Sequence, residues 1–585
     1  MTSGKPVKSF KNPSGDLADS PSSHVKALLD NVMAAKKQLG TASSDDYALI
    51  DRPFSAIQSS VQDNKAAPHA LEDLVKAYAR ATVAASLATH CLTAFPWQRA
   101  IEAAQRYDVQ LKEQKSKGDD DLFRQLPLLG LVFSVKDCIN VEGHATTIGC
   151  SSRVDAVPAS SAWIVQQLED KGAIMIAKTA CPQAMVSNVT HSPLWGKVRS
   201  PFGERYEVGG SSGGEAALVA MGGSALGLGT DMGGSVRQPA SLTELFGLKF
   251  ASDTFQFDQG KDFVTGLPDT PIPATAPGFL ARHLSTIQDV CATLTLLGGT
   301  LEAKQSPEDG RLAVSTYEAS PEVTSALDRL ASDSDGLGKV TAVPDLLGDG
   351  DAWWAEIWMR HAGSRGFQAG LDMIGDDPLI PESMFNTRPK VLSQHEYSEA
   401  QKDLEALIKG LEGKMGGEGR ASSDLILCPS FSYGGPISSK SFQAAQKAEI
   451  WLQAINLLDW PSISIPLPVR DELRQTWREQ SEADNEGWSK GRQGQEVVEV
   501  WQTMQQEGLP VLNGQDDVWS RKADESAAAD ETGGAEQSGQ GGAKRRKVDG
   551  ERLPVLSVQL VARPGKEALL LPVAQRIIDL AQRWR

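Results

Sequence analysis

The sequence predicts an α/β fold, and three stretches between residues 126 and 231 carry that prediction. LPLLGLVFSVKD (126–137) is short, apolar and bounded by Pro and Gly, which is typical of a buried strand. SSAWIVQQLEDKGAIMIAKTA (160–180) has a helical period up to Gly172, followed by a second buried strand. SALGLGTD (224–231) is a third strand-like run. Strands that alternate with helices in this way indicate a sheet packed against helices.

The rest of the chain extends this pattern. Residues 24–115 have helical periodicity, and one apolar face carries Leu71, Leu74, Val75, Tyr78 and Ala81. Residues 253–275 are loop-like, and 276–299 are predicted to restart a helix. The stretch 320–425 is helical and partly polar, a composition typical of a region that covers a site. Core-like runs return over 424–467, and the chain closes with a strand (553–565) and a helix (569–584).

At 585 residues the chain is longer than one simple core usually organises. We expect a disordered tail over 1–24 and one large domain over 25–470. Residues 471–550 are rich in Glu, Gln, Asp, Gly and Ser, which predicts a polar, low-complexity insertion. Residues 551–585 then complete the domain, because loop-closure entropy grows slowly with the length of an insertion.

Composition excludes several function classes. A formal net charge of −17 argues against nucleic acid as a partner, because phosphate contacts need clustered Lys and Arg. The six cysteines include no CxxC pair, so neither a zinc site nor a disulfide framework is expected. We predict no metal and no cofactor. Neither a signal peptide nor a membrane-spanning run is visible, although peripheral contact with a membrane stays open.

The most informative stretch is EVGGSSGGEAALVAMGGSALGLGTDMGGSVRQPAS (207–241). It contains two glycine-flanked serine turns, at 209–214 and 233–235. Glycine gives access to backbone conformations that expose N–H groups, and converging N–H groups are what an oxyanion hole requires. EAALVAM, after the first turn, is a good helix former, so the positive end of a helix would lie beside the serines.

This stretch resembles the signature of the amidase signature family, in particular its fatty-acid amide hydrolase and fungal acetamidase branches. Residues 126–150 resemble the lysine segment of that family, and 181–203 resemble the segment before its glycines. Residues 455–466 and the closing strand and helix resemble its C-terminal half. The resemblance implies the amidase-signature fold, a central mixed β-sheet covered by helices on both faces.

The resemblance also implies a Ser–cis-Ser–Lys triad. Lys136 is the base, Ser211 the bridging serine after a cis peptide bond, and Ser235 the nucleophile. A serine hydroxyl needs a base to take its proton, and lysine is a base only when neutral, which burial beside an apolar strand favours. The backbone N–H groups of Met232, Gly233, Gly234 and Ser235 are expected to form the oxyanion hole.

Other roles follow from the same resemblance. Asp231 and Arg237 are expected to hold the loop through hydrogen bonds. Met185, with Ser211, is expected to contact the substrate, and a core position for Met185 is an equal alternative. The chain departs from the family pattern at three positions. Glu244 stands where glycine is usual, and Phe250 and Val208 stand where proline is usual.

The predicted function is hydrolysis of a small or acyl-chain carboxylic acid amide to an acid and ammonia or an amine, through an acyl-enzyme. Two alternatives on the same fold are a subunit of a glutamine-dependent amidotransferase and a non-catalytic scaffold. A GxSxG elbow at 209–213 would need a downstream Asp and His. His283, His361 and His395 have no convincing context for that role.

The remaining predictions concern partners and location. A small-molecule amide is the expected partner, and a homodimer stays open. A cytoplasmic location is expected. The basic run Lys544–Lys547 either directs nuclear import or is a solvated charge cluster. The identity of the amide depends on pocket residues that we expect within 320–425.

Overall fold

The computed structural model describes fourteen parts of the chain, namely residues 21–63, 69–116, 122–203, 206–254, 275–297, 310–317, 319, 321–347, 351–380, 382, 392–416, 423–431, 449–467 and 556–583. The first helix begins at Pro21, so residues 21–24 of the predicted tail are helical. The insertion predicted over 471–550 and the basic run 544–547 lie outside the described residues.

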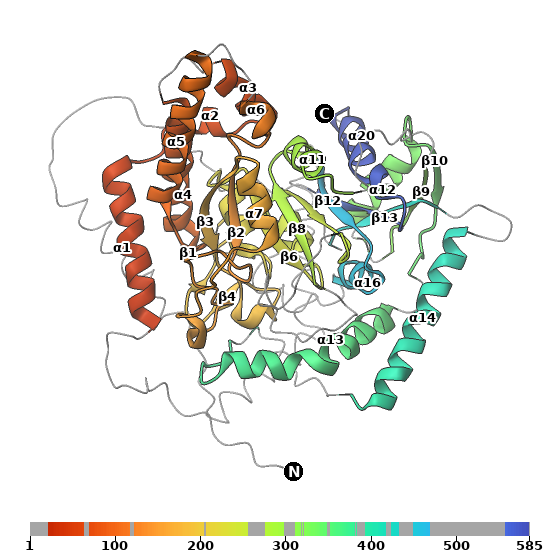
Figure 1. Ribbon diagram of the computed structural model, residues 1–585. Coiled ribbons are helices and arrows are strands. Elements are labelled where there is room, and N and C mark those ends of the chain that lie inside the picture. The colour runs from red at the N-terminus through yellow and green to blue at the C-terminus, as the bar shows by residue number, and fades with distance from the viewer. Residues whose placement is uncertain are drawn as a thin grey trace, which may run out of the picture.

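An eleven-stranded mixed sheet forms the centre of the molecule (Figure 1), in the order β1-β3-β2-β6-β8-β7-β12-β13-β11-β9-β10. β2 runs parallel to both β3 and β6, whereas β6, β8, β7, β12 and β13 are successively antiparallel. The strands are β1 (Leu92–Ala94), β2 (Val132–Lys136), β3 (Ile174–Thr179), β6 (Leu226–Asp231), β7 (Phe246–Lys249), β8 (Ala276–Ala281), β9 (Arg311–Val314), β10 (Lys339–Ala342), β11 (Leu425–Pro429), β12 (Ser462–Leu467) and β13 (Leu556–Ala562). A separate hairpin joins β4 (His191–Ser192) to β5 (Gly196–Lys197).

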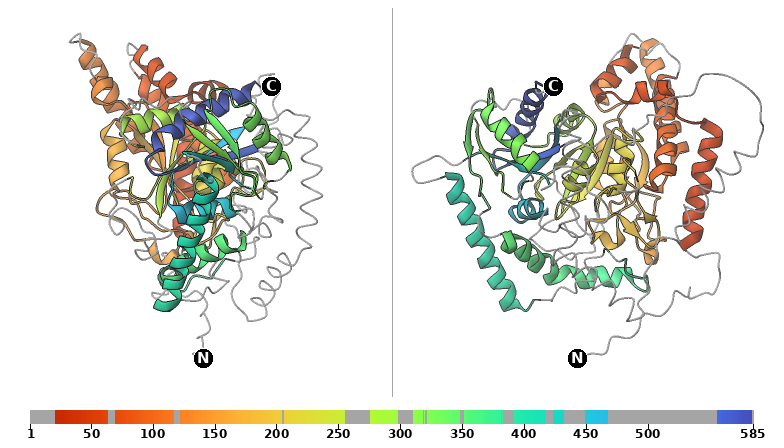
Figure 2. Two further views of the ribbon diagram at one scale, coloured as in Figure 1. Left: turned by 90° about the vertical axis from the view of Figure 1, so that its right-hand side faces the viewer. Right: turned by 180° about the vertical axis from the view of Figure 1, so that it is seen from behind.

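Helices cover both faces of the sheet, which gives the predicted α/β architecture (Figures 1 and 2). α4 and α5 stand beside the β1–β3 edge, and α13 runs below the sheet toward α14 in Figure 1. The helices are α1 (Pro21–Leu39), α2 (Ser44–Ile50), α3 (Phe54–Asp63), α4 (Ala70–Thr89), α5 (Trp97–Ser116), α6 (Leu122–Gln125), α7 (Trp163–Asp170), α8 (Gly213–Ala220), α9 (Arg237–Leu242), α11 (Leu284–Thr293), α12 (Pro321–Ser332), α13 (Asp351–Ile374), α14 (Gln394–Gly416), α16 (Ile450–Leu458) and α20 (Leu570–Gln582). Among the described helices, none combines the length and apolar character needed to cross a bilayer.

The three predicted strands are confirmed as β2, β3 and β6, and all their residues are buried. The prediction of a helix from residue 276 is wrong, because residues 276–281 form β8 and the helix begins at Leu284. β8 lies between β6 and β7 and pairs with both. At Gly278 a Cβ would lie 2.5 Å from the Leu248 carbonyl oxygen, so this central position requires glycine.

Two groups of buried apolar side chains stabilise the fold. The main core lies between the sheet and helices α1–α8, α11, α12 and α20. A second core lies where α13, α14 and α16 meet, and includes Trp354, Ile357, Trp358, Leu404, Trp451 and Ile455. Met232, just after β6, packs against the second core. The turn after β6 therefore lies between the sheet and the helices of the later part of the chain.

Candidate active site

Two neighbouring parallel strands place Lys136 and the second serine turn at one edge of the sheet. β2 ends at Lys136, and β6, which pairs with it in parallel, ends at Asp231. Since parallel strands have their carboxyl ends at the same edge, the residues that follow them meet there. α8 begins at Gly213, at the end of the first serine turn, and packs on β6 and β2.

Lys136 is fully buried, and oxygen acceptors surround its ammonium group. Nζ lies 2.7 Å from Ser211 Oγ and 2.9 Å from Thr230 Oγ1, with the Thr230 carbonyl oxygen at 3.4 Å. In its neutral form the lysine could accept the proton of the Ser211 hydroxyl across the same short contact.

The two serine turns lie against each other. The Gly210–Ser211 peptide bond is cis. The Ser212 N–H donates to the Ser235 carbonyl at 3.1 Å, and the Gly210 N–H donates to Gln238 Oε1 at 3.2 Å. These two bonds tie the first turn to Ser235 of the second turn and to Gln238, three residues after it, and Ser211 and Ser235 line one pocket.

Asp231 and Arg237 stabilise the second serine turn through hydrogen bonds. Asp231 accepts hydrogen bonds from the N–H groups of Gly234 (2.8 Å) and Val236 (3.0 Å). Arg237 donates to both carboxylate oxygens of Asp231, each at 3.0 Å, and both side chains are fully buried. Burial would raise the pKa of Asp231, but Arg237 and the backbone donors outweigh it and keep the pKa well below its usual value.

The glycines of the second turn allow close approach from α13 and α16. A Cβ on Gly233 would lie 2.7 Å from Trp358 Cζ2, and one on Gly234 would lie 2.7 Å from Leu452 Cδ1. Gly234 also has φ of +114°, a region that L residues rarely adopt. The Gly234 N–H points to Asp231 and is already engaged, which differs from the prediction that it faces an oxyanion. No described residue accepts from the N–H groups of Met232, Gly233 or Ser235.

A pocket lies in front of the serines, with about 740 Å³ of empty space when its open mouth is included. Met185 lines it while also packing against the main core, so the core position is confirmed and contact with a substrate stays a prediction. Trp358 and Ala362 of α13 line it as well, and they belong to the predicted 320–425 region. The Trp358 indole N–H donates to the Met232 carbonyl at 3.0 Å, which links the pocket wall to the second turn.

Sequence reasoning missed several polar pocket residues, among them Asn188, Gln238, Glu449 and Gln453. Glu449 precedes α16 and Gln453 lies four residues later, so the two share one face. Polar residues at that spacing in the otherwise apolar segment AEIWLQAINLL were the available signal. Burial raises the pKa of Glu449, and hydrogen bonds from Asn188 and Gln238 oppose that rise.

Glu215, in the first turn of α8, is a second buried acid near the lysine. It accepts hydrogen bonds from the hydroxyls of Ser134 on β2 (2.5 Å) and Thr179 on β3 (2.6 Å). Burial raises the pKa of Glu215 to about 8, although the two hydroxyls and Lys136 act against that rise. Glu215 therefore anchors the helix that follows the first serine turn to two strands of the sheet.

The structure shows what surrounds the three departures from the family pattern. Glu244 has φ of +59°, in the left-handed region that favours glycine. Phe250 is fully buried edge-on against Phe279, with ring centroids 5.1 Å apart, and its N–H donates to the Pro277 carbonyl, which a proline could not do. Val208 is also fully buried. None of the three lines the pocket.

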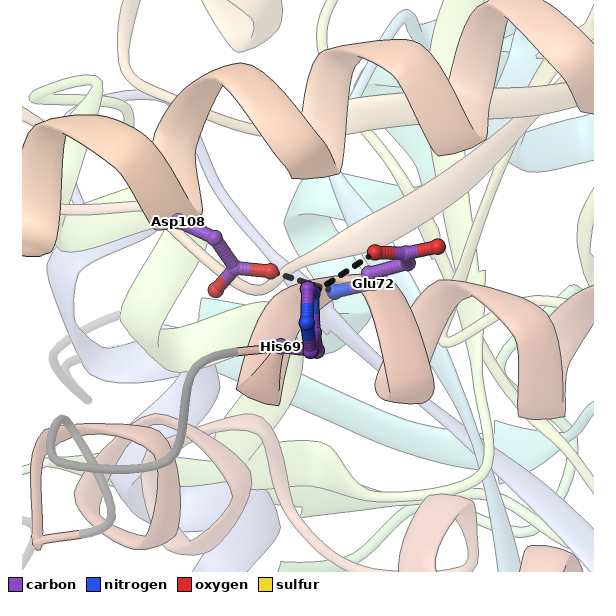
Figure 3. Close-up of side chains that lie close together, drawn as sticks. All are labelled: His69, Glu72 and Asp108. Carbon is purple, nitrogen blue, oxygen red and sulfur yellow. Dashed lines mark hydrogen bonds and ion pairs between the residues drawn. The ribbon is translucent and has the colours of Figure 1, made fainter.

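One acidic cluster away from the pocket has metal-like spacing, formed by His69, Glu72 and Asp108 (Figure 3). Asp108 accepts from the N–H groups of Leu71 and Glu72, both at 3.0 Å, and so caps the start of α4. Glu72 contacts His69 (3.0 Å) and Lys76 (2.7 Å). Helix capping and ion pairing account for this cluster without a metal.

Comparison with known proteins gives a family match for the part of the chain that contains this site. The family model described as Amidase matches residues 73–288, which contain Lys136 and both serine turns. This part of the chain is similar to the amidase family. "Amidase 1" of Gibberella moniliformis is 38% identical over 200 residues, which are 34% of this chain and 36% of that protein. A glutamyl-tRNA(Gln) amidotransferase subunit from Lachnospira eligens is 36% identical over 162 residues, which are 27% of this chain and 32% of that protein.

These amidase-family alignments span about a third of the length of each curated relative. The fold likeness extends further. A solved structure of "Fatty acid amide hydrolase" superposes with a TM-score of 0.67, covering 97% of this chain and 91% of that one at 18% sequence identity. The amidase-signature fold therefore continues through the helices beyond residue 288.

Proposed function

We propose that this chain is an amidase that hydrolyses the carbon–nitrogen bond of a carboxylic acid amide. The observation that carries the proposal is the buried contact of 2.7 Å between Lys136 Nζ and Ser211 Oγ, in a pocket that Ser235 also lines. The match of residues 73–288 to the amidase family model supports it.

Each residue has one task in the proposed mechanism. Ser235 Oγ attacks the amide carbonyl carbon while its proton passes to Ser211 Oγ, whose own proton passes to neutral Lys136. Ser211 then returns a proton to the leaving nitrogen, the C–N bond breaks, and an acyl ester remains on Ser235. Water, deprotonated along the same route, attacks that ester and releases the acid and free Ser235.

Negative charge develops on the carbonyl oxygen during both attacks. The N–H groups of Met232, Gly233 and Ser235 are proposed to stabilise it, while the N–H of Gly234 keeps the turn in shape through Asp231. Trp358 fixes the same turn by its hydrogen bond to the Met232 carbonyl.

A substitution at the proposed nucleophile tests this function. Ser235→Ala should reduce hydrolysis of any amide cleaved by the wild type at least about 1,000-fold and abolish labelling by a fluorophosphonate probe. Ser332→Ala, at an exposed serine of α12, is the matched control and should behave as the wild type. Full activity of Ser235→Ala would refute the proposed mechanism.

An amidotransferase subunit is the second candidate, favoured by the likeness to the Lachnospira eligens protein. Glutamine carries a carboxylate, which a site usually pairs with Arg or Lys. None of the described pocket-lining residues is Arg or Lys, and this favours a simple amidase. Hydrolysis of amides by the purified chain alone would separate the two candidates. A non-catalytic scaffold would leave the serines unlabelled by the probe.

A further inference from the structure

The pocket has one polar corner, formed by Asn188, Gln238, Glu449 and Gln453. Glu449 and Gln453 project from one face of α16, and Gln238 comes from α9. The pocket also has apolar lining residues, namely Met185, Val186, Met232, Trp358 and Ala362. It therefore offers both polar and apolar groups to whatever occupies it.

Gln238 links the polar corner to the first serine turn. Its Oε1 accepts from the Gly210 N–H at 3.2 Å, and its Nε2 donates to Glu449 Oε1 at 2.7 Å. Asn188 Nδ2 donates to the same Glu449 oxygen at 2.5 Å. Both donors orient the Glu449 carboxyl group. Gln238 connects this group to the first serine turn and so fixes its position relative to the proposed catalytic serines.

Gln453 adds an acceptor that the protein leaves unused. Its Oε1 is buried, and no described residue donates a hydrogen bond to it. A buried acceptor without a donor loses its hydrogen bonds to water and gains none, so such a group calls for an explanation. Because this one lines the pocket that holds Ser211 and Ser235, a substrate that brings a donor would satisfy it.

The charges around the polar corner favour a particular kind of donor. Glu449 is its acidic group, and the described pocket-lining residues include no Lys, Arg or His to pair with it. An ammonium group can donate to Gln453 and neutralise Glu449 at the same time. A methyl or carboxylate end would leave the acceptor unsatisfied or place like charges together.

We propose that the polar corner recognises a donor nitrogen of the substrate, best an ammonium group, so that the preferred amides carry an amino group beyond the scissile bond. The inference rests on the proposed amidase function and narrows it. Plain acyl-chain amides then become poorer substrates, and Glu449 and Gln453 are specificity-determining residues. The apolar side chains of the pocket contact the methylene spacer between the scissile amide nitrogen and the amino nitrogen of the substrate.

A matched series of amides tests the proposal. Primary amides with spacers of increasing length end in methyl, ammonium or trimethylammonium, and kcat/KM is measured for each. We expect the wild type to prefer ammonium over methyl by about tenfold or more at the best spacer length, which corresponds to about 1.4 kcal/mol. Trimethylammonium has the charge but no N–H donor, so it should lose much of that preference.

Two variants locate the preference. Glu449→Gln keeps the shape and Gln453→Met keeps the length of the side chain, and each should lower the ammonium-to-methyl ratio about tenfold. A ratio measured on one preparation is independent of how much of the protein is folded. Glu102→Gln and Gln110→Met, at exposed positions of α5, are the matched controls and should keep the wild-type ratio.

Equal or better cleavage of the methyl series by the wild type, or an unchanged ratio in both variants, would overturn this inference while leaving the amidase function intact. Absence of both amide hydrolysis and fluorophosphonate labelling in the wild type would instead overturn the proposed function.

Discussion

The second serine turn and the pocket wall that packs against it are built in different ways. The turn is stabilised mainly by contacts within a few residues, with Asp231 bonded to Gly234, Val236 and Arg237. The wall consists of α13 and α16, more than a hundred residues further along the chain, which pack in their own core. A short motif can therefore encode the reactive groups, whereas the chemistry of the wall can vary without changing that motif.

The largest expected effect concerns the turn. Asp231→Ala removes the acceptor of the turn N–H groups and leaves Arg237 buried without its carboxylate partner. Breaking a buried ion pair in this way costs about 3–5 kcal/mol, so we expect a loss of that size in denaturant unfolding, together with loss of hydrolysis.

Asp335→Ala is the comparison for that variant. Asp335 pairs with Arg576 at 2.8 Å, but its side chain is 69% exposed. An exposed pair contributes under about 1 kcal/mol, so this change should be nearly neutral. Equal losses in the two variants would contradict a special role for the ion pair in the turn.

This difference explains what the sequence could predict. Ser211 and Ser235 lie in turns whose glycines are required by close packing, and Lys136 ends a short apolar strand, so each has a signal in its own short stretch of sequence. The location of Trp358 and Ala362 was predicted only as a region, because helical periodicity does not show which face meets the pocket. Glu449 and Gln453 were missed because their significance depends on Asn188 and Gln238, which are distant in the chain. β8 was misread because its short apolar run has no period that separates strand from helix.

Glu215, which ties α8 to β2 and β3, gives a prediction of how the unfolding free energy depends on pH. Its pKa is raised from 4.5 to about 8 in the folded protein, so the folded state binds a proton more tightly than the unfolded state. The stabilising contribution is therefore full below about pH 4.5 and is lost as the pH rises toward 8.

Glu215→Gln removes this titration while retaining side-chain size. At about 1.4 kcal/mol per pH unit, the unfolding free energy of the variant should rise relative to the wild type by on the order of 3 kcal/mol between pH 5 and pH 8. Unfolding is measured at both pH values for both proteins. A difference that does not change with pH would show that Glu215 ionises normally.

Trp358→Phe tests whether the wall supports the turn. The variant keeps an aromatic ring near Gly233 but loses the N–H that binds the Met232 carbonyl. One such hydrogen bond contributes about 0.5–1.5 kcal/mol, so kcat should fall by up to about tenfold. Trp354→Phe, one turn earlier in α13, loses a bond to Leu347 instead and should leave kcat unchanged. Equal kcat in the two variants would mean that the turn is independent of the wall.

The smallest expected effect concerns Glu244, which lies between α9 and β7. Glycine is usual at this position in the family that the sequence resembles. With φ of +59°, this residue is in a conformation that costs L residues roughly 1–2 kcal/mol relative to glycine. Glu244→Gly and Glu244→Ala both remove the side chain, so the difference between them isolates the backbone. We expect the glycine variant to be about 1 kcal/mol more stable than the alanine variant in denaturant unfolding, with the same kcat for both. If the two variants were equally stable, the backbone at residue 244 would relax freely. The segment between α9 and β7 would then be less rigid than the hydrogen bonds of Asp231 and Arg237 imply.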